Sequence, residues 1–186
     1  GYERKPGEDE AIGTMRGELI TWLARRGRDE KVMAFARSAA KRYLADPASV
    51  DPGIVDAVLR LYASEGNAAL FDDMRARFEA AAVPSLRGRF LGTLGAFDDS
   101  TLEAKALDYM LSDAVRPTES FTIMRGFMGK GDAANRRLWQ WMTSHYDAIA
   151  TRVPPPALRF LPMMGGGCDE ARLQAMQAFF AEPQHA

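Results

Sequence analysis

The sequence predicts an all-α protein in which about ten helices stack in pairs as a solenoid, an α-α superhelix. Two observations predict the helices. Ala, Leu, Arg, Glu and Met are abundant, and no stretch keeps the period-two alternation of Val, Ile or Thr that is typical of strands. A third observation, a weak repeat in the places where helices end and begin, predicts that they stack in pairs.

Turn-forming residues divide the chain into ten expected helices, joined by short connections. They span residues 10–26, 29–45, 52–65, 67–82, 84–96, 99–112, 118–130, 132–151, 156–164 and 169–181. Short connections between helices favour antiparallel neighbours.

Helix starts and ends are marked by residues with a physical role there. Side-chain oxygens that can bond unpaired N–H groups predict N-caps at Asp29, Asp51, Asn67, Ser100 and Asp132. Prolines suit a first turn, which needs no N–H donor, at Pro52, Pro84 and Pro117. Glycines that adopt a left-handed backbone at little cost are expected after helix ends, at Gly27, Gly66 and Gly131.

The repeat becomes visible when these turns are aligned. Cap-like residues recur at intervals of about 32 to 38 residues, a period that suits helix-pair repeats. No tetratricopeptide or ankyrin consensus is visible, so the pattern favours a degenerate HEAT-like or armadillo-like array. A closed helical bundle is the competing architecture.

Length and composition restrict the class of protein further. The 186 residues suggest one domain, over residues 10–183, with 1–9 as a linker or the remainder of a cleaved tag and 184–186 as a tail. Gly1, in place of an initiator Met, predicts a domain excised from a longer protein. The net charge of −1 gives no reason to expect a nucleic-acid partner. No apolar run is long enough for a membrane span.

Chemistry carried by this chain alone is not expected. One Cys and two His exclude an internal disulfide, a CxxC-type metal site and a three-histidine zinc site, so no metal or cofactor is expected here. Simpler explanations cover the remaining groups. These are a turn for glycines 165–167, an ordinary Cys168, a structural His145, helix-start acids at 72–73 and 98–99, solvated arginines at 25–28 and 87–89, and core aromatics at 139, 141, 146, 179 and 180.

One region is more distinctive than composition. It comprises residues 111–119 (LSDAVRPTE), 124–131 (MRGFMGKG), 134–141 (ANRRLWQW), 145–149 (HYDAI) and 173–180 (LQAMQAFF). It resembles the C-terminal helical domain of zinc aminopeptidases of the aminopeptidase N, puromycin-sensitive and endoplasmic-reticulum aminopeptidase type. That domain typically shows V-R-x-Q-[DE], N-x-x-G-R-x-x-A-W-x-F, N-W-x-x-[LI] and E-x-F-F. The sequence departs from this pattern at Pro117-Thr118, Ala134-Asn135 and His145-Tyr146, and it lacks H-E-x-x-H.

The resemblance implies a domain that caps the catalytic cleft of a zinc-dependent aminopeptidase and encloses a chamber for peptides. The zinc and the catalytic motifs would belong to an upstream catalytic domain, which is the expected partner together with the peptide. An arginine suits a peptide carboxylate because its guanidinium donates two parallel hydrogen bonds. Arg116 is the first candidate on its place in the motif, followed by Arg60 and Arg136. The alternative for Arg116 is a bond to the last carbonyls of helix 99–112.

Two other functions stay open at this point. A stand-alone helical-repeat scaffold would bind a protein segment, and a start codon immediately upstream in the gene would favour it over the peptidase. A helical-repeat nucleic-acid binder is disfavoured by the net charge and would show salt-dependent retention on heparin.

Overall fold

The computed structural model describes residues 1–127, 129–164 and 169–185. In this part of the chain the regular elements are all helices, and no strand is present. The first half contains α1 (Glu10–Arg25), α2 (Glu30–Ala45), η1 (Pro47–Ser49), α3 (Pro52–Ser64), α4 (Ala68–Ala80), α5 (Pro84–Leu94) and α6 (Ser100–Met110). The second half contains η2 (Pro117–Glu119), α7 (Phe121–Gly126), α8 (Asp132–Ser144), α9 (Tyr146–Arg152), α10 (Pro155–Leu158), α11 (Leu161–Met164), α12 (Glu170–Ala181) and η3 (Pro183–His185).

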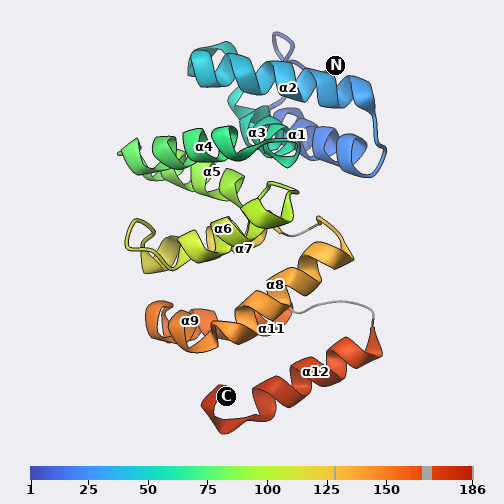
Figure 1. Ribbon diagram of the computed structural model, residues 1–186. Coiled ribbons are helices and arrows are strands. Elements are labelled where there is room, and N and C mark those ends of the chain that lie inside the picture. Colours follow the sequence, from blue (N-terminus) through green and yellow to red (C-terminus); the bar gives the residue numbers. More distant parts are fainter. Residues whose placement is uncertain (128, 165–168, 186) are drawn as a thin grey trace.

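The helices stack in layers from α1 and α2 at one end of the molecule to α12 at the other (Figure 1). The odd-numbered helices α1, α3, α5 and α7 contact one another in succession, and α2 and α4 each pack against the odd-numbered helix that follows. The predicted all-α class is confirmed, and this succession is typical of a helical-pair solenoid.

The apolar core runs through the stack. Four phenylalanines are fully buried along it, namely Phe71, Phe78, Phe97 and Phe127. Phe71 of α4 packs on Phe97, with 5.3 Å between the ring centroids, so the helix pairs share one interior. None of the described helices is both long and apolar enough to cross a membrane.

Three of the five N-caps predicted from the sequence are present in the structure. Asp29, Asp51 and Asn67 each accept a bond from a backbone N–H in the first turn of the next helix, as predicted. Two predicted caps were wrong by one residue. Asp99 caps α6 and Ser100 is its first residue, while Gly131 precedes α8 and Asp132 begins it.

Of the three glycines expected in a left-handed conformation, only Gly131 has a positive φ, of 105°. At the turn after α1 the left-handed residue is instead Arg28, with φ 51°. The N–H of Gly27 still bonds to the carbonyl of Trp22, so the helix ends there without a left-handed glycine.

Three expected helices are shorter or broken. The expected helix 118–130 is η2 followed by α7, which ends at Gly126, and the positive φ of Gly129 and Gly131 does not suit a continued helix. The expected helix 132–151 breaks at His145, whose φ of −119° and ψ of 18° lie outside the helical range. The expected helix 156–164 divides into α10 and α11, since Pro162 has no N–H with which to continue the helix.

Candidate functional site

Close helix contacts build one wall of the candidate site. An added Cβ at Gly17 of α1 would lie 2.9 Å from the carbonyl oxygen of Gly53 in α3. A Cβ at Gly126 of α7 would lie 2.5 Å from the carbonyl carbon of Gly95, just after α5. Because real Cβ contacts are longer than this, only glycine lets these backbones approach so closely.

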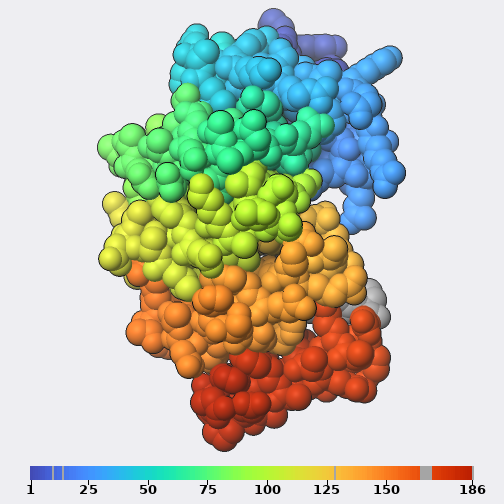
Figure 2. Space-filling view, viewed as in Figure 1, coloured from blue at the N-terminus to red at the C-terminus, as the bar shows by residue number. Residues whose placement is uncertain are grey.

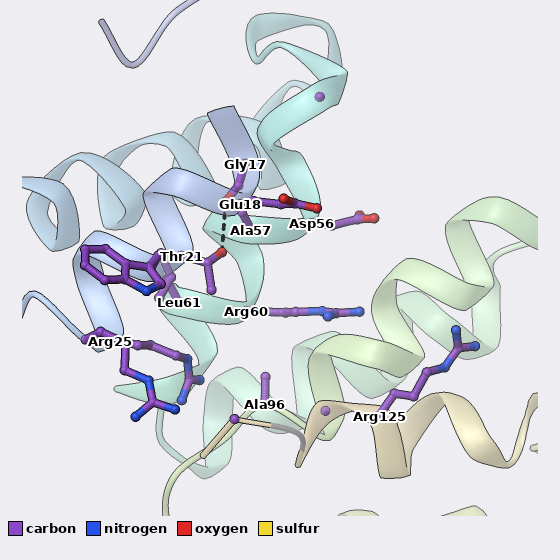
Figure 3. Close-up of a pocket in the computed structure, with 15 residues that line it drawn as sticks. Gly17, Glu18, Thr21, Arg25, Asp56, Ala57, Arg60, Leu61, Ala96 and Arg125 are labelled. Carbon is purple, nitrogen blue, oxygen red and sulfur yellow. Dashed lines mark hydrogen bonds between the residues drawn. The ribbon is translucent and has the colours of Figure 1, made fainter. Parts of the chain in front are cut away.

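A cavity of about 510 Å³ opens beside these contacts, lined by residues from α1, α3, α7 and the turns after α5 and α7. Its charged lining residues are Glu18, Arg25, Arg26, Asp56, Arg60 and Arg125. Figure 3 shows Arg60 extending from α3 into the space between Arg25 and Arg125. We call this cavity the arginine groove.

Arg60 is the central cation of the arginine groove. It is exposed, and within the described residues no carboxylate pairs with it. The nearest candidate acid on α3, Asp56, is instead bonded by Arg89 of α5 at 2.6 Å. Gly92 of α5 leaves room for the guanidinium, since an added Cβ there would lie 3.2 Å from Nη2 of Arg60. With four arginines against two carboxylates, the lining of the groove carries a net positive charge.

A buried ionic network lies beneath one edge of the groove. Lys130 and Glu103 have side chains only 2% and 3% exposed, and the Lys130 Nζ lies 2.9 Å from the Glu103 Oε1. Arg137 bonds the other carboxylate oxygen of Glu103 at 2.6 Å. Burial lowers the pKa of Lys130, and the hydrogen bond to Glu103 opposes that shift.

This network reaches the groove through Asp98. Asp98 lies 3.8 Å from the Lys130 Nζ and 3.7 Å from Arg25, a lining residue. The acid pair at 98–99 is thus occupied by an ion pair at Asp98 and by the helix cap at Asp99. In the part of the chain that the structure describes, no group of three or more His, Cys, Asp or Glu residues could hold a metal ion.

Arg116, the candidate marked by the motif, lies outside the arginine groove. It is exposed at the start of η2, and its backbone N–H bonds the Glu119 carboxylate at 3.1 Å. The alternative role for Arg116 was a bond to the last carbonyls of helix 99–112, and the arginine that bonds the carbonyl at the end of this expected helix is instead Arg152 of α9. Arg152 donates to the carbonyls of Ser112 and Val115.

The motif around Arg116 has a structural role through Glu119. Arg87 of α5 donates from Nε and Nη2 to the two carboxylate oxygens of Glu119 at 2.9 and 3.0 Å. The same guanidinium bonds the carbonyls of Phe78 and Ala114 at 3.3 and 3.2 Å. The hydrogen bond from Arg87 holds the pKa of Glu119 below its usual value. The arginines at 87–89, predicted to be solvated, are instead partners in ion pairs with Glu119 and Asp56.

Arg136, the third candidate, is exposed near the start of α8. It lies 2.7 Å from Asp132 one turn earlier, and Asp132 also bonds Arg172 of α12 at 2.8 Å. Arg136 does not line the arginine groove. Of the three predicted arginines, the structure brings only Arg60 into the groove.

The groove arginines that sequence reasoning missed are Arg25, Arg26 and Arg125. Arg25 and Arg26 had the features of a solvated face, and Arg125 had no distinguishing neighbour. A usable signal existed in their spacing. Arg25, Arg60 and Arg125 follow one another at about one and about two repeat lengths, which places them on α1, α3 and α7, with α5 lying between the last two.

The aromatic side chains of the C-terminal part serve packing, as predicted. Trp139, Tyr146, Phe179 and Phe180 pack together and join α12 to α8 and α9, with 5.4 Å between the Tyr146 and Phe179 centroids. His145 stacks on Trp141 at 4.6 Å, and its Nδ1 lies 2.8 Å from the Trp141 carbonyl oxygen, which agrees with a structural histidine. The glycine run 165–167 and Cys168 lie outside the described residues.

The fold and the groove define an all-helical domain that presents a cavity lined by several arginines. Comparison with known proteins identifies its family. The chain matches the family described as "ERAP1-like C-terminal domain" over residues 1–186 and belongs to it. The predicted relationship to the C-terminal domain of this class of aminopeptidases is confirmed.

Several similar proteins are aminopeptidases. Aminopeptidase M1-A of Oryza sativa subsp. japonica is 25% identical over 159 residues, which cover 81% of this chain and 17% of that protein. Aminopeptidase M1 of Arabidopsis thaliana is 25% identical over 158 residues, 80% of this chain and 17% of that protein. The alanine/arginine aminopeptidase of Saccharomyces cerevisiae is 34% identical over 76 residues, 41% of this chain and 8% of that protein. The chain therefore spans less than a fifth of the length of these relatives.

Proposed function

We propose that this chain is the C-terminal capping domain of a zinc-dependent aminopeptidase that removes N-terminal residues from peptides. Membership of the ERAP1-like C-terminal domain family supports the proposal, and so do relatives whose names state that they are aminopeptidases. The upstream catalytic domain would be its partner, and the arginine groove would form part of the wall of a peptide chamber.

The described residues provide no set of ligands for a zinc ion. A zinc site needs several His, Cys, Asp or Glu side chains around one point, and the described residues contain no such cluster. We therefore assign the zinc to the catalytic domain of the parent protein and no part of the hydrolysis to this chain. The contribution of this chain would be to enclose and hold the substrate.

The single observation that carries the binding role is that Arg60 forms no ion pair with a carboxylate of the described residues. An exposed guanidinium with no carboxylate partner within the described residues can bind the carboxylate of a peptide without first breaking an ion pair. Arg25 and Arg125 would add positive charge on either side of it. We keep Arg116 and Arg136 as secondary candidates, in contact with other parts of a peptide. Arg136 would have to exchange its bond to Asp132 for the substrate.

Charge reversal at Arg60 in the full-length parent enzyme tests this role. Arg60→Glu should raise KM for peptides by about tenfold or more, since a charged hydrogen bond contributes about 1.5–3 kcal/mol. KM for a single-residue chromogenic amide, which does not reach the groove, should change by less than about twofold. Arg159→Glu is the matched control, because Arg159 is also exposed but lies outside the groove.

The same assay ranks the two secondary candidates. Arg116→Glu and Arg136→Glu should each raise peptide KM less than Arg60→Glu does. If all four variants change KM for peptides and for the chromogenic amide alike, the distal binding role is wrong. The capping role would then rest on family membership alone.

A further inference from the structure

The charged side chains of the arginine groove are segregated within it. Figure 3 shows the carboxylates of Glu18 and Asp56 on one side of Arg60. The guanidiniums of Arg25 and Arg125 lie on the other side. Asp56 is already held in an ion pair with α5, so it adds little negative charge to the cavity. The part of the groove between Arg25 and Arg125 is therefore basic.

The basic side chains of the groove come from different levels of the helical stack. Arg25 lies on α1, Arg60 on α3 and Arg125 on α7. These helices are blue, blue-green and gold in Figure 2, and α5 packs between the last two. Figure 3 shows the Arg60 and Arg125 guanidiniums at separate points of the cavity. A ligand with one carboxylate, bound to Arg60, would leave Arg125 without an anion.

Arg125 is well placed to bind a second carboxylate. It is exposed on α7, and no carboxylate of the described residues pairs with it. The next residue, Gly126, packs directly against the backbone of Gly95, which holds this part of α7 in place. A donor on a fixed backbone loses less freedom on binding, and a guanidinium binds a carboxylate through two parallel hydrogen bonds.

Arg25 adds positive charge that is only loosely paired. Its nearest carboxylate, that of the half-exposed Asp98, lies 3.7 Å away, which is longer than a hydrogen bond. The Lys130 Nζ lies 3.8 Å from the same carboxylate. Because Asp98 would keep this cationic neighbour, Arg25 can turn towards a bound anion without leaving Asp98 alone.

We propose that the arginine groove selects peptides whose C-terminal residue is Asp or Glu. Arg60 binds the terminal carboxylate, Arg125 binds the acidic side chain, and Arg25 strengthens the positive field around both. A cavity of about 510 Å³ has room for such a residue, since ligand pockets typically measure about 300–1,000 Å³. The proposal rests on the peptide-binding role proposed above and adds a substrate class to it.

Two peptides that differ only in a C-terminal Glu or Gln test the proposal in the full-length parent enzyme. The value of kcat/KM should be about threefold to fivefold higher for the Glu peptide, which is the range of a strong but exposed ion pair. Arg125→Gln should reduce this preference to less than about 1.5-fold. Arg159→Gln is the matched control and should keep the preference, because Arg159 is exposed but lies outside the groove.

Arg60→Gln distinguishes failure of this proposal from failure of the proposed function. If Arg60→Gln raises KM for both peptides while the wild-type enzyme treats them alike, the groove binds peptides without selecting acidic ones. If Arg60→Gln changes KM for neither peptide, the groove is not a peptide site and both proposals are wrong. A preference for the Glu peptide that persists in Arg125→Gln also overturns the selection proposed here, because the acidic side chain must then bind elsewhere.

Discussion

Removing the guanidinium of Arg87 should destabilise the whole stack. Arg87 is 8% exposed and joins three separate segments through Glu119, the Phe78 carbonyl and the Ala114 carbonyl. Breaking a buried ion pair by removing one partner costs about 3–5 kcal/mol. Because the Glu119 side chain keeps 17% exposure and can recover some hydration, we expect about 3 kcal/mol for Arg87→Met.

Denaturant unfolding followed by circular dichroism measures this loss. In a thermal melt, about 3 kcal/mol corresponds to a fall in Tm of roughly 6 to 12 °C for a domain of this size. A double-mutant cycle with Glu119→Gln separates the ion pair from the two carbonyl bonds. A free-energy loss below about 1 kcal/mol for Arg87→Met would refute the claim that this guanidinium holds the three segments together.

The pH dependence of stability gives an independent check on the same pair. The bond from Arg87 lowers the pKa of Glu119 in the folded state below its ordinary value of 4.5. The contribution of Glu119 is therefore fully present above pH 4.5 and is lost as the pH falls through the lower, folded-state pKa. Glu119→Gln should flatten the dependence of the unfolding free energy on pH in that acid range, measured by urea titrations at a series of pH values.

Two further substitutions test the close packing and the C-terminal attachment. Gly126→Ala should cost about 2 kcal/mol or more, since its Cβ would meet the Gly95 backbone, whereas Gly88→Ala in open space should stabilise α5 by about 0.5–1 kcal/mol. Chemical denaturation of both variants gives the comparison, and equal effects would contradict the packing argument. Phe179→Ala should lower stability by about 2 kcal/mol and make α12 the first site of limited proteolysis, because Phe179 packs on α8 and α9. Unchanged protease resistance would show that α12 is attached by other contacts.

The helical class was predictable because its signals are local. The caps at Asp29, Asp51 and Asn67 depend on side chains two or three residues from the groups they bond. The break at His145 was not predictable in this way. Residues 132–151 carry good helix formers, and the chain turns there with the histidine ring stacked on Trp141.

The candidate site was predictable only in part, because it depends on which faces of distant helices meet. The sequence suggests Arg60 only through its arginine-rich surroundings, and the structure places it in the arginine groove beside Arg25 and Arg125. Arg116 had the stronger sequence argument and lies elsewhere. Arg89, which bonds Asp56, is 33 residues away, so no local pattern reveals that Asp56 is paired with Arg89 and not with Arg60.

The motif on which the family resemblance rests and the groove proposed to bind peptides occupy different parts of the molecule. The motif at residues 115–119 is explained by packing, since Glu119 receives the Arg87 guanidinium and thereby fixes η2 against α5. Arg60 contributes little to that packing and faces an open cavity. Stability and peptide binding should therefore separate by position. Arg87→Met should lower Tm while leaving the ratio of peptide KM to amide KM close to wild type. Arg60→Glu should raise that ratio while leaving Tm close to wild type. A variant at Arg87 that shifted the ratio as strongly as one at Arg60 would show that the groove is not an independent site.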